Sequence, residues 1–156
     1  MMATPKEDVE KLMNDLMPLA EKMLKENGEF FPYGGVITAE GKIVHHGAYT
    51  GIEQPKSADV IKLLIESFQK SAEEKKVIAT AIIYDIKTIP PGQTEKTDAI
   101  CVSLEHRDGY FVEVVFPYSL KNKELVVQPP FAAKISGKIF KTKKTEPGAA
   151  ANSHPR

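Results

Sequence analysis

The fold is decided by residues 99–117, which read AICVSLEHRDGYFVEVVFP. Two runs rich in β-branched and aromatic residues flank Arg107-Asp108-Gly109, a pattern that predicts a β-hairpin. If all three central residues form the loop, with the glycine in the left-handed conformation, Leu104 pairs with Val112. A two-residue loop would instead pair Leu104 with Glu113 and mix polar with apolar residues on one face. Because a slip of one residue turns a whole face over, the sequence predicts the three-residue loop.

The two faces of this hairpin differ in chemistry. One face is apolar or aromatic except at a single histidine, and we expect it to lie under the helices; it carries Ile100, Val102, Leu104, His106, Tyr110, Val112, Val114 and Phe116. The other face is mixed, which suits partial exposure, and it carries Cys101, Ser103, Glu105, Phe111, Glu113 and Val115. We therefore expect partners on the mixed face, with Phe111 as a candidate binding residue.

Two amphipathic helices are predicted upstream of the hairpin. Over residues 9–24, apolar side chains recur at spacings of three and four, which places them on one helical face. Residues 4–7 form a capping box before this helix, and Asn27-Gly28 is a suitable stop. Pro18 removes one helical hydrogen bond and should kink the helix or split it near Met17. The second helix starts at Ser57, and its apolar stripe contains Ile61, Leu64, Ile65, Phe68 and Ala72.

Further β-branched runs complete the predicted sheet. Residues 29–50 indicate a hairpin, and residues 77–89 indicate a central strand that is apolar on both faces through Ile83. A last strand is expected over residues 133–141. We therefore predict an α+β fold, with a mainly antiparallel sheet of five or six strands and two helices on one face. The element order α-ββ-α-βββ also occurs in profilin-like and roadblock-like domains, an analogy of order that carries no function.

Length and composition indicate one globular domain. The chain has 156 residues, of which 42% are hydrophobic and 27% charged, so it can build a real core. We expect the domain to span residues 1–142, because residues 143–156 have almost nothing to bury and are predicted to be disordered. One cysteine excludes an internal disulfide, and no apolar run is long enough to span a membrane. These features predict a cytoplasmic protein.

The charge balance bears on the choice of partners. Lysine and arginine together number 21, as do aspartate and glutamate, so the formal net charge is zero. Zero net charge gives no long-range attraction to nucleic acid, and it weakens repulsion between copies, which favours a homodimer or another protein partner. Nucleic-acid contact by the lysine-rich C-terminus is a weaker alternative, because that segment lacks the interleaved aromatic residues of a stacking surface.

Four polar residues are candidates for acid–base chemistry: Asp85, Asp98, Glu105 and His106. Asp85 interrupts an apolar strand, and Asp98 immediately precedes another. With the other two they form a candidate general acid/base cluster at one end of the sheet. The alternative is that these residues serve turns and structural hydrogen bonds.

Metal and cofactor chemistry find no support in the sequence. His45 and His46 are adjacent on a predicted strand and therefore point to opposite faces, so we predict no metal site. Cys101 lies in the middle of a strand and is predicted to be a packed, inert thiol. No phosphate-binding or dinucleotide-binding motif occurs, and we expect no cofactor.

The segment Gly28-Glu29-Phe30-Phe31-Pro32-Tyr33-Gly34 gathers three aromatic residues in a loop. Aromatic side chains are costly to leave in water unless they pack or bind something. They either close the core at the end of the first helix or form a recognition surface for a protein or a small apolar ligand. Phe30, Phe31 and Tyr33 are therefore candidate binding residues.

This aromatic segment, followed by a Glu-Gly turn, resembles a small group of bacterial proteins without assigned function. Asp98-Ala99-Ile100, Glu105-His106 and Pro117-Tyr118 match that group as well, so the resemblance covers about residues 5–118. It implies a bacterial cytoplasmic domain and assigns no catalytic residue.

We therefore expect a non-enzymatic protein-interaction or ligand-binding domain that self-associates through a sheet face or edge. Two alternatives stay open. One is a small enzyme that uses the acid/base cluster, and the other is an inhibitor or immunity-type partner of another bacterial protein. An enzyme of this kind requires at least two of the four acid–base groups within hydrogen-bond reach around a pocket.

Overall fold

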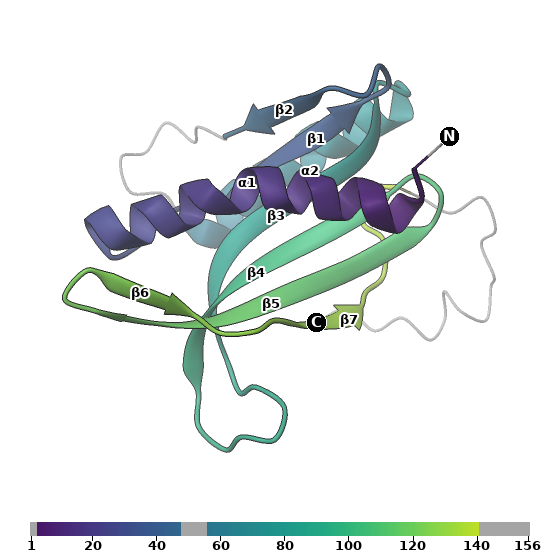
Figure 1. The fold of residues 1–156 in the computed structure, drawn as a ribbon. Coiled ribbons are helices and arrows are strands. Elements are labelled where there is room, and N and C mark those ends of the chain that lie inside the picture. Colours follow the sequence, from purple (N-terminus) through teal and green to yellow (C-terminus); the bar gives the residue numbers. More distant parts are fainter. Residues whose placement is uncertain (1–2, 48–55, 141–156) are drawn as a thin grey trace.

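The computed structural model describes residues 3–47 and 56–140, which form two helices and seven strands (Figure 1). In chain order these are α1 (Pro5–Asn27), β1 (Tyr33–Thr38), β2 (Ile43–His46), α2 (Ser57–Glu73), β3 (Val77–Thr88), β4 (Thr97–His106), β5 (Tyr110–Lys121), β6 (Glu124–Val127) and β7 (Phe131–Lys134). The α+β class and the order α-ββ-α-βββ are confirmed, and two short strands follow that order. The predicted disordered tail, residues 143–156, lies outside the described residues.

The strands form an antiparallel sheet in the order β2-β1-β3-β4-β5-β6, and β7 also pairs with β5. The expected five or six strands are too few because β5 has two partners on one edge, with β7 along residues 112–115 and β6 along residues 118–121. The β5–β6 turn, Asn122-Lys123, takes φ angles of 52° and 66° without the glycine that usually marks such a turn. The expected strand over residues 133–141 is wrong beyond Lys134, where the chain leaves the sheet.

The predicted register of the β4–β5 hairpin is confirmed. Leu104 pairs with Val112, and His106 pairs with Tyr110. Gly109 has φ 93°, the left-handed angle that the three-residue loop requires. The apolar face of the hairpin lies in the main core together with α1, and Ile100, Val102 and Leu104 are its most deeply buried residues.

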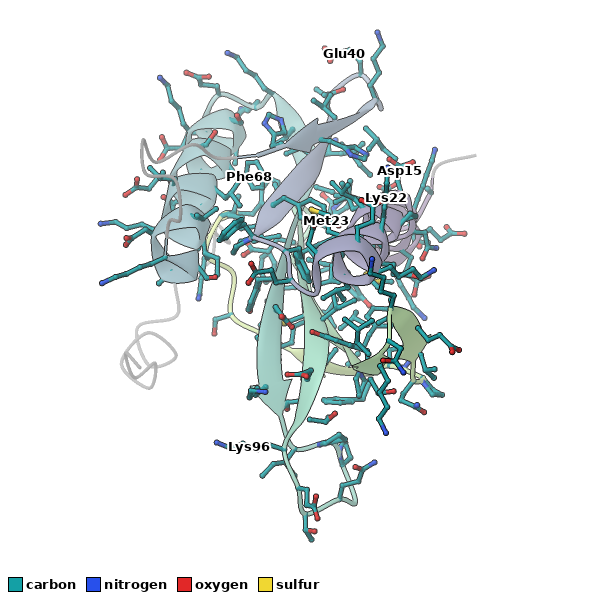
Figure 2. All side chains as sticks on the ribbon, turned by 90° about the vertical axis from the view of Figure 1, so that its left-hand side faces the viewer. Asp15, Lys22, Met23, Glu40, Phe68 and Lys96 are labelled. Atoms are coloured by element: carbon teal, nitrogen blue, oxygen red, sulfur yellow. The ribbon has the colours of Figure 1, made fainter. Side chains whose placement is uncertain are left out.

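The two helices pack on opposite faces of the sheet, so the expectation that they share one face is wrong (Figure 2). Side chains alternate along β3: Ala81 and Ile83 belong to the core under α1, whereas Ile82 belongs to the core under α2. A strand covered on one side only would alternate apolar with polar residues. The apolar run of β3 therefore reflects burial on both faces.

Two consecutive glycines in β1 let both helices approach the sheet. A Cβ atom on Gly35 would lie 2.9 Å from a methyl carbon of Leu16 in α1. A Cβ atom on Gly34 would lie 3.2 Å from the ring of Phe68 in α2. Because neighbouring strand residues face opposite sides, this pair removes side chains from both faces at once.

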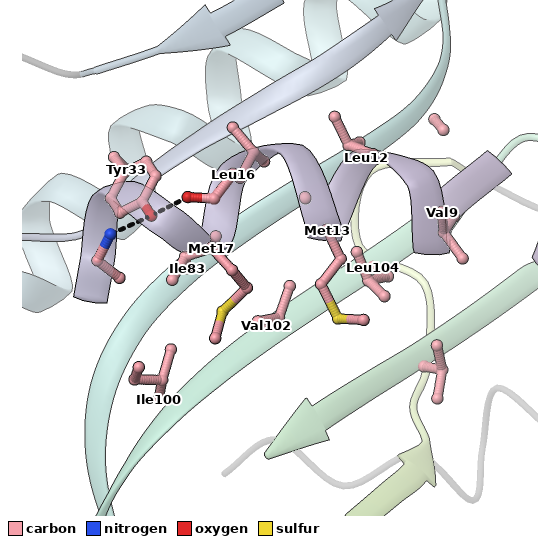
Figure 3. Close-up of a cluster of buried hydrophobic side chains, with 14 of the residues drawn as sticks. Val9, Leu12, Met13, Leu16, Met17, Tyr33, Ile83, Ile100, Val102 and Leu104 are labelled. Carbon is pink, nitrogen blue, oxygen red and sulfur yellow. Dashed lines mark hydrogen bonds between the residues drawn. The ribbon is translucent and has the colours of Figure 1, made fainter. Parts of the chain in front are cut away.

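Tyr33 completes the hydrogen bonding of α1 near Pro18, which lies inside the helix. The buried Tyr33 hydroxyl accepts a hydrogen bond from the Ala20 N–H at 3.0 Å and donates one to the Leu16 carbonyl (Figure 3). These two backbone groups are four residues apart and would pair directly in a regular helix. Insertion of a side chain between such groups bends a helix, as a proline does. Burial raises the pKa of Tyr33, so the hydroxyl keeps its proton.

Tyr33→Phe is expected to lower the free energy of unfolding by about 2 kcal/mol, because two buried backbone groups lose their partner. In a Pro18→Ala background the helix can pair these groups itself, so the same change should cost about 1 kcal/mol less. Urea denaturation of the wild type, the two single variants and the double variant measures both costs. Equal costs in the two backgrounds would contradict the coupling between hydroxyl and proline.

Candidate functional site

The four acid–base candidates do not form one cluster. Asp98 lies near the start of β4, and Asp85 lies beside it on β3. Glu105 and His106 lie at the other end of β4, and as neighbours on a strand they point to opposite faces. The single site that an acid/base mechanism requires is therefore not assembled by these residues.

Asp85 and Asp98 each have a partner from the sheet. The Tyr118 hydroxyl donates to Asp85 Oδ1 at 3.0 Å, and Lys87 Nζ donates to Asp98 Oδ1 at 2.7 Å. Burial raises the pKa of Asp85, an effect that the hydrogen bond from Tyr118 opposes. These contacts give both carboxylates a structural role at this end of the sheet.

His106 is 3% exposed and uses both ring nitrogens. Its Nε2 lies 2.9 Å from Asp8 Oδ2, and its Nδ1 accepts a hydrogen bond from the Asp108 N–H at 3.1 Å. With Nδ1 as the acceptor, the neutral ring carries its proton on Nε2, facing Asp8. His106 therefore ties the first turn of α1 to the β4–β5 turn, and no ring nitrogen is left for proton transfer.

Glu105 anchors the last described residues of the chain, which we call the strap (residues 137–140). Glu105 is 2% exposed. Its carboxylate accepts three backbone hydrogen bonds, from Lys138 at 2.9 Å, Ile139 at 2.9 Å and Phe140 at 3.1 Å. Gln69 of α2 donates from Nε2 to the Lys138 carbonyl at 2.7 Å, so the strap is held from the helix side as well. Both oxygens of Glu105 are occupied, which supports an anchoring role rather than acid catalysis.

The strap also covers Phe111, the candidate binding residue on the mixed face. A Cβ atom on Gly137 would lie 2.8 Å from the Phe111 ring, so the strap backbone rests directly on that ring. Ile139 and Phe140 are 6% and 8% exposed, and they join the core that contains Phe68 of α2. Phe111 is thus half-buried beneath the chain's own residues, which a partner would have to displace to reach all of it.

The aromatic segment after α1 divides into core and surface. Phe30 and Tyr33 are each 6% exposed, and their rings meet edge to face at a centroid distance of 6.1 Å. Phe31 is 44% exposed. The interpretation of Phe30 and Tyr33 as a recognition surface is corrected, because both close the core; Phe31 alone of the three remains open to a partner.

His45, His46 and Cys101 have ordinary environments. His45 and His46 face opposite sides of β2, with His45 Nε2 2.7 Å from Asp15 Oδ2 and the His46 ring 5.5 Å from the Phe68 ring. Cys101 is buried, and this burial raises its pKa to about 12, so the thiol stays neutral and unreactive. Within residues 3–47 and 56–140, no group of three or more His, Cys, Asp or Glu is placed to hold a metal ion.

An open groove beside the strap is the candidate binding site. It encloses about 580 Å³ between the end of α2, the start of β3, the β4–β5 turn and the strap, and we call it the α2 groove. Its size lies within the range of about 300–1,000 Å³ that is usual for ligand sites. The apolar lining consists of Ala72, Val77, Ile139 and Phe140, and the polar lining of Gln69, Glu73, Lys75, Arg107 and Asp108.

Lys75 occupies an unusual backbone position at the rim of the groove. Its φ of 58° lies in the left-handed region that favours glycine. The N–H of Lys75 donates to the Ala72 carbonyl and that of Lys76 to the Ser71 carbonyl, which is the usual way for a helix to end with a glycine. A lysine here accepts backbone strain, and such strain is often found at functional sites. Sequence patterns did not indicate this groove, because its residues come from three separate stretches of the chain, within 69–77, 107–108 and 139–140.

Neither described helix is long and apolar enough to cross a membrane. No protein-family model matches the chain, and no curated protein or solved structure matches it either. The resemblance to a bacterial group therefore stays a prediction, and the α2 groove and the strap are the features of the chain that bear on its function.

Proposed function

We propose that the chain is a non-enzymatic binding domain whose α2 groove takes an apolar segment of a partner protein. The observation that carries this proposal is the groove itself, an open space of about 580 Å³ floored by Ala72, Val77, Ile139 and Phe140. Covering such a surface removes apolar area from water, which is the main driving force in protein association.

The charged residues at the rim of the groove favour selectivity between partner segments more than they increase the attraction to any of them. It combines two basic residues, Lys75 and Arg107, with two acidic ones, Glu73 and Asp108. Since the whole chain also has no net charge, long-range steering contributes little to binding. Charges of both signs around an apolar floor favour a partner segment in one orientation over others.

Acid–base catalysis has less support than binding. Asp98 near the start of β4 and Asp85 beside it on β3 lie away from Glu105 and His106 at the end of β4, and each of the four is engaged by a structural partner. Self-association is expected through a sheet face or edge, and α2 and the strap cover part of the mixed face on which we expect partners. A homodimer, a cytoplasmic location and an inhibitor-like role therefore remain secondary proposals.

The groove can be tested with a small apolar anion. Anilinonaphthalene sulfonate should bind the full-length chain at one saturable site, and NMR amide shifts should concentrate at Val77, Arg107 and Ile139. Ala72→Trp fills the groove and should remove this binding. Leu63→Trp is the matched control, because Leu63 is a 39% exposed residue of the same helix outside the groove.

Two results would contradict the proposed function. One is the absence of saturable binding in the wild-type chain. The other is equal binding by the Ala72→Trp and Leu63→Trp variants, since the dye would then lie elsewhere. Thermal unfolding of both variants checks that each is folded before the comparison.

A further inference from the structure

The buried carboxylate of Glu105 is a binding site for polypeptide backbone. In the described part of the chain, its ligands are the N–H groups of three successive residues rather than a lysine or arginine side chain. A buried anion needs such compensation, and backbone N–H groups supply it without regard to side-chain identity. Residues 138–140 form bends, which is how three successive N–H groups can point at one carboxylate. The site therefore binds a bent stretch of chain through its main chain.

Side chains add a second level of recognition. Ile139 and Phe140 of the strap are buried in the core under α2, at 6% and 8% exposure. The α2 groove begins beside these two residues, which form part of its lining. The sequence continues with Lys141 and Thr142, which cannot offer an apolar side chain to that groove. The surface around Glu105 and the α2 groove thus holds two apolar residues of the strap, and the groove has space for a third.

We infer that the surface around Glu105 and the α2 groove is a receptor for a segment of another protein that bends as the strap does, and that the strap is its built-in competitor. The inference rests on the proposed function, because the α2 groove is the part of the receptor that stays open while the strap is bound. The partner segment has three successive N–H groups directed at Glu105 and two adjacent apolar residues in place of Ile139 and Phe140. A third apolar residue follows them and fills the groove.

Two other occupants are less suitable. Residues 141–156 contain no apolar residue larger than alanine and proline, so the chain's own end cannot fill the apolar floor. A second copy of the chain would offer the same strap that is already bound within each molecule. A short tether gives that internal strap an effective concentration of about 1 mM or more, so exchange between copies gains nothing by itself. A partner segment with one apolar residue more than the strap makes additional contacts in the α2 groove, which the internal strap cannot make.

The test uses full-length variants in which the strap is weakened, together with synthetic peptides. Phe140→Ser removes one apolar anchor of the strap. Gly137→Val also weakens the strap, because the valine side chain would collide with the Phe111 ring and lift the strap from it. Either variant serves if the other fails to fold. Isothermal titration calorimetry then measures binding of acetyl-Ser-Gly-Lys-Ile-Phe-Leu-amide, which copies residues 136–140 and adds a leucine.

The peptide should bind the strap-weakened variants at least about tenfold more tightly than the wild-type chain, where the internal strap competes. A peptide that ends in lysine instead of leucine should bind more weakly, since it leaves the groove empty. A peptide with proline in place of the isoleucine loses one N–H toward Glu105 and should bind at least about tenfold more weakly. Equal binding to wild type and variants, or indifference to the proline, would overturn the inference.

The two proposals fail in different ways. If the dye binds and Ala72→Trp blocks it, but no peptide binds a folded variant, the receptor inference is wrong and the groove proposal stands. If the dye shows no saturable site and the leucine and lysine peptides bind the strap-weakened variants equally well, while the proline peptide binds more weakly, the groove proposal is wrong and the strap site is still a receptor.

Discussion

Gly34→Ala is expected to lower the free energy of unfolding by about 3 kcal/mol or more, although it adds only one methyl group. The added Cβ would collide with the carbonyl oxygen of Ala81 on the neighbouring strand and would lie 3.2 Å from the Phe68 ring. A ring can shift, but the Ala81 carbonyl belongs to the backbone of the central strand β3. Relief of the clash would therefore separate β1 from β3, where the two strands pair.

Urea denaturation measures this loss, and Gly47→Ala is the matched control. A Cβ atom on Gly47 would meet nothing within 4 Å, so its substitution should leave stability nearly unchanged. Gly34→Ala with a cost below about 1 kcal/mol would mean that β1 does not approach β3 and α2 as closely as described.

Glu105→Gln is the second substitution with a large expected effect, a loss of about 3 kcal/mol in the free energy of unfolding. The amide keeps the size of the side chain but replaces one acceptor oxygen with a donor, which would face the backbone N–H groups of the strap. At least one of those groups would lose its partner in a buried site. The strap should then detach, and its amide hydrogens should exchange with solvent faster than in the wild-type chain.

Glu113→Gln provides the comparison, because Glu113 lies on the same face of the neighbouring strand but holds no part of the strap. It should cost less than about 1 kcal/mol and leave exchange at residues 138–140 unchanged. Hydrogen exchange separates the strap from the rest of the fold. Similar costs for both variants, with the strap amides equally protected, would show that Glu105 does not anchor this segment.

Local patterns were sufficient to predict the β4–β5 hairpin. Its two strands alternate with a period of two, and only one register keeps the apolar residues together, so Leu104 and Val112 could be paired without a structure. The capping box of α1 is equally local, since Thr4 and Glu7 bond each other. Features of this kind depend on residues a few positions apart.

The errors concern features that depend on distant residues. The prediction placed α2 on the wrong face of the sheet. Apolar residues on both faces of β3 were taken to indicate only a central strand, whereas they also indicate that a helix covers each face. Glu105 was predicted to be an acid–base group because its partners could not be recognised in the sequence. They are backbone N–H groups of the strap, and nearly every residue type carries such a group. His106 was misjudged for a similar reason, since its partner Asp8 lies 98 residues earlier in the chain.

The anchoring of the strap has a consequence for the time at which the fold is completed during synthesis. Lys138 follows Glu105 by 33 residues. At a translation rate of about 5–20 residues per second, roughly 2–7 s pass between the synthesis of Glu105 and that of the strap. Within this interval the residues of the β4–β5 hairpin are all made, but the strap that covers the Glu105 carboxylate and the Phe111 ring is not. A chaperone or another nascent chain that meets the protein in these seconds encounters no internal competitor at this site.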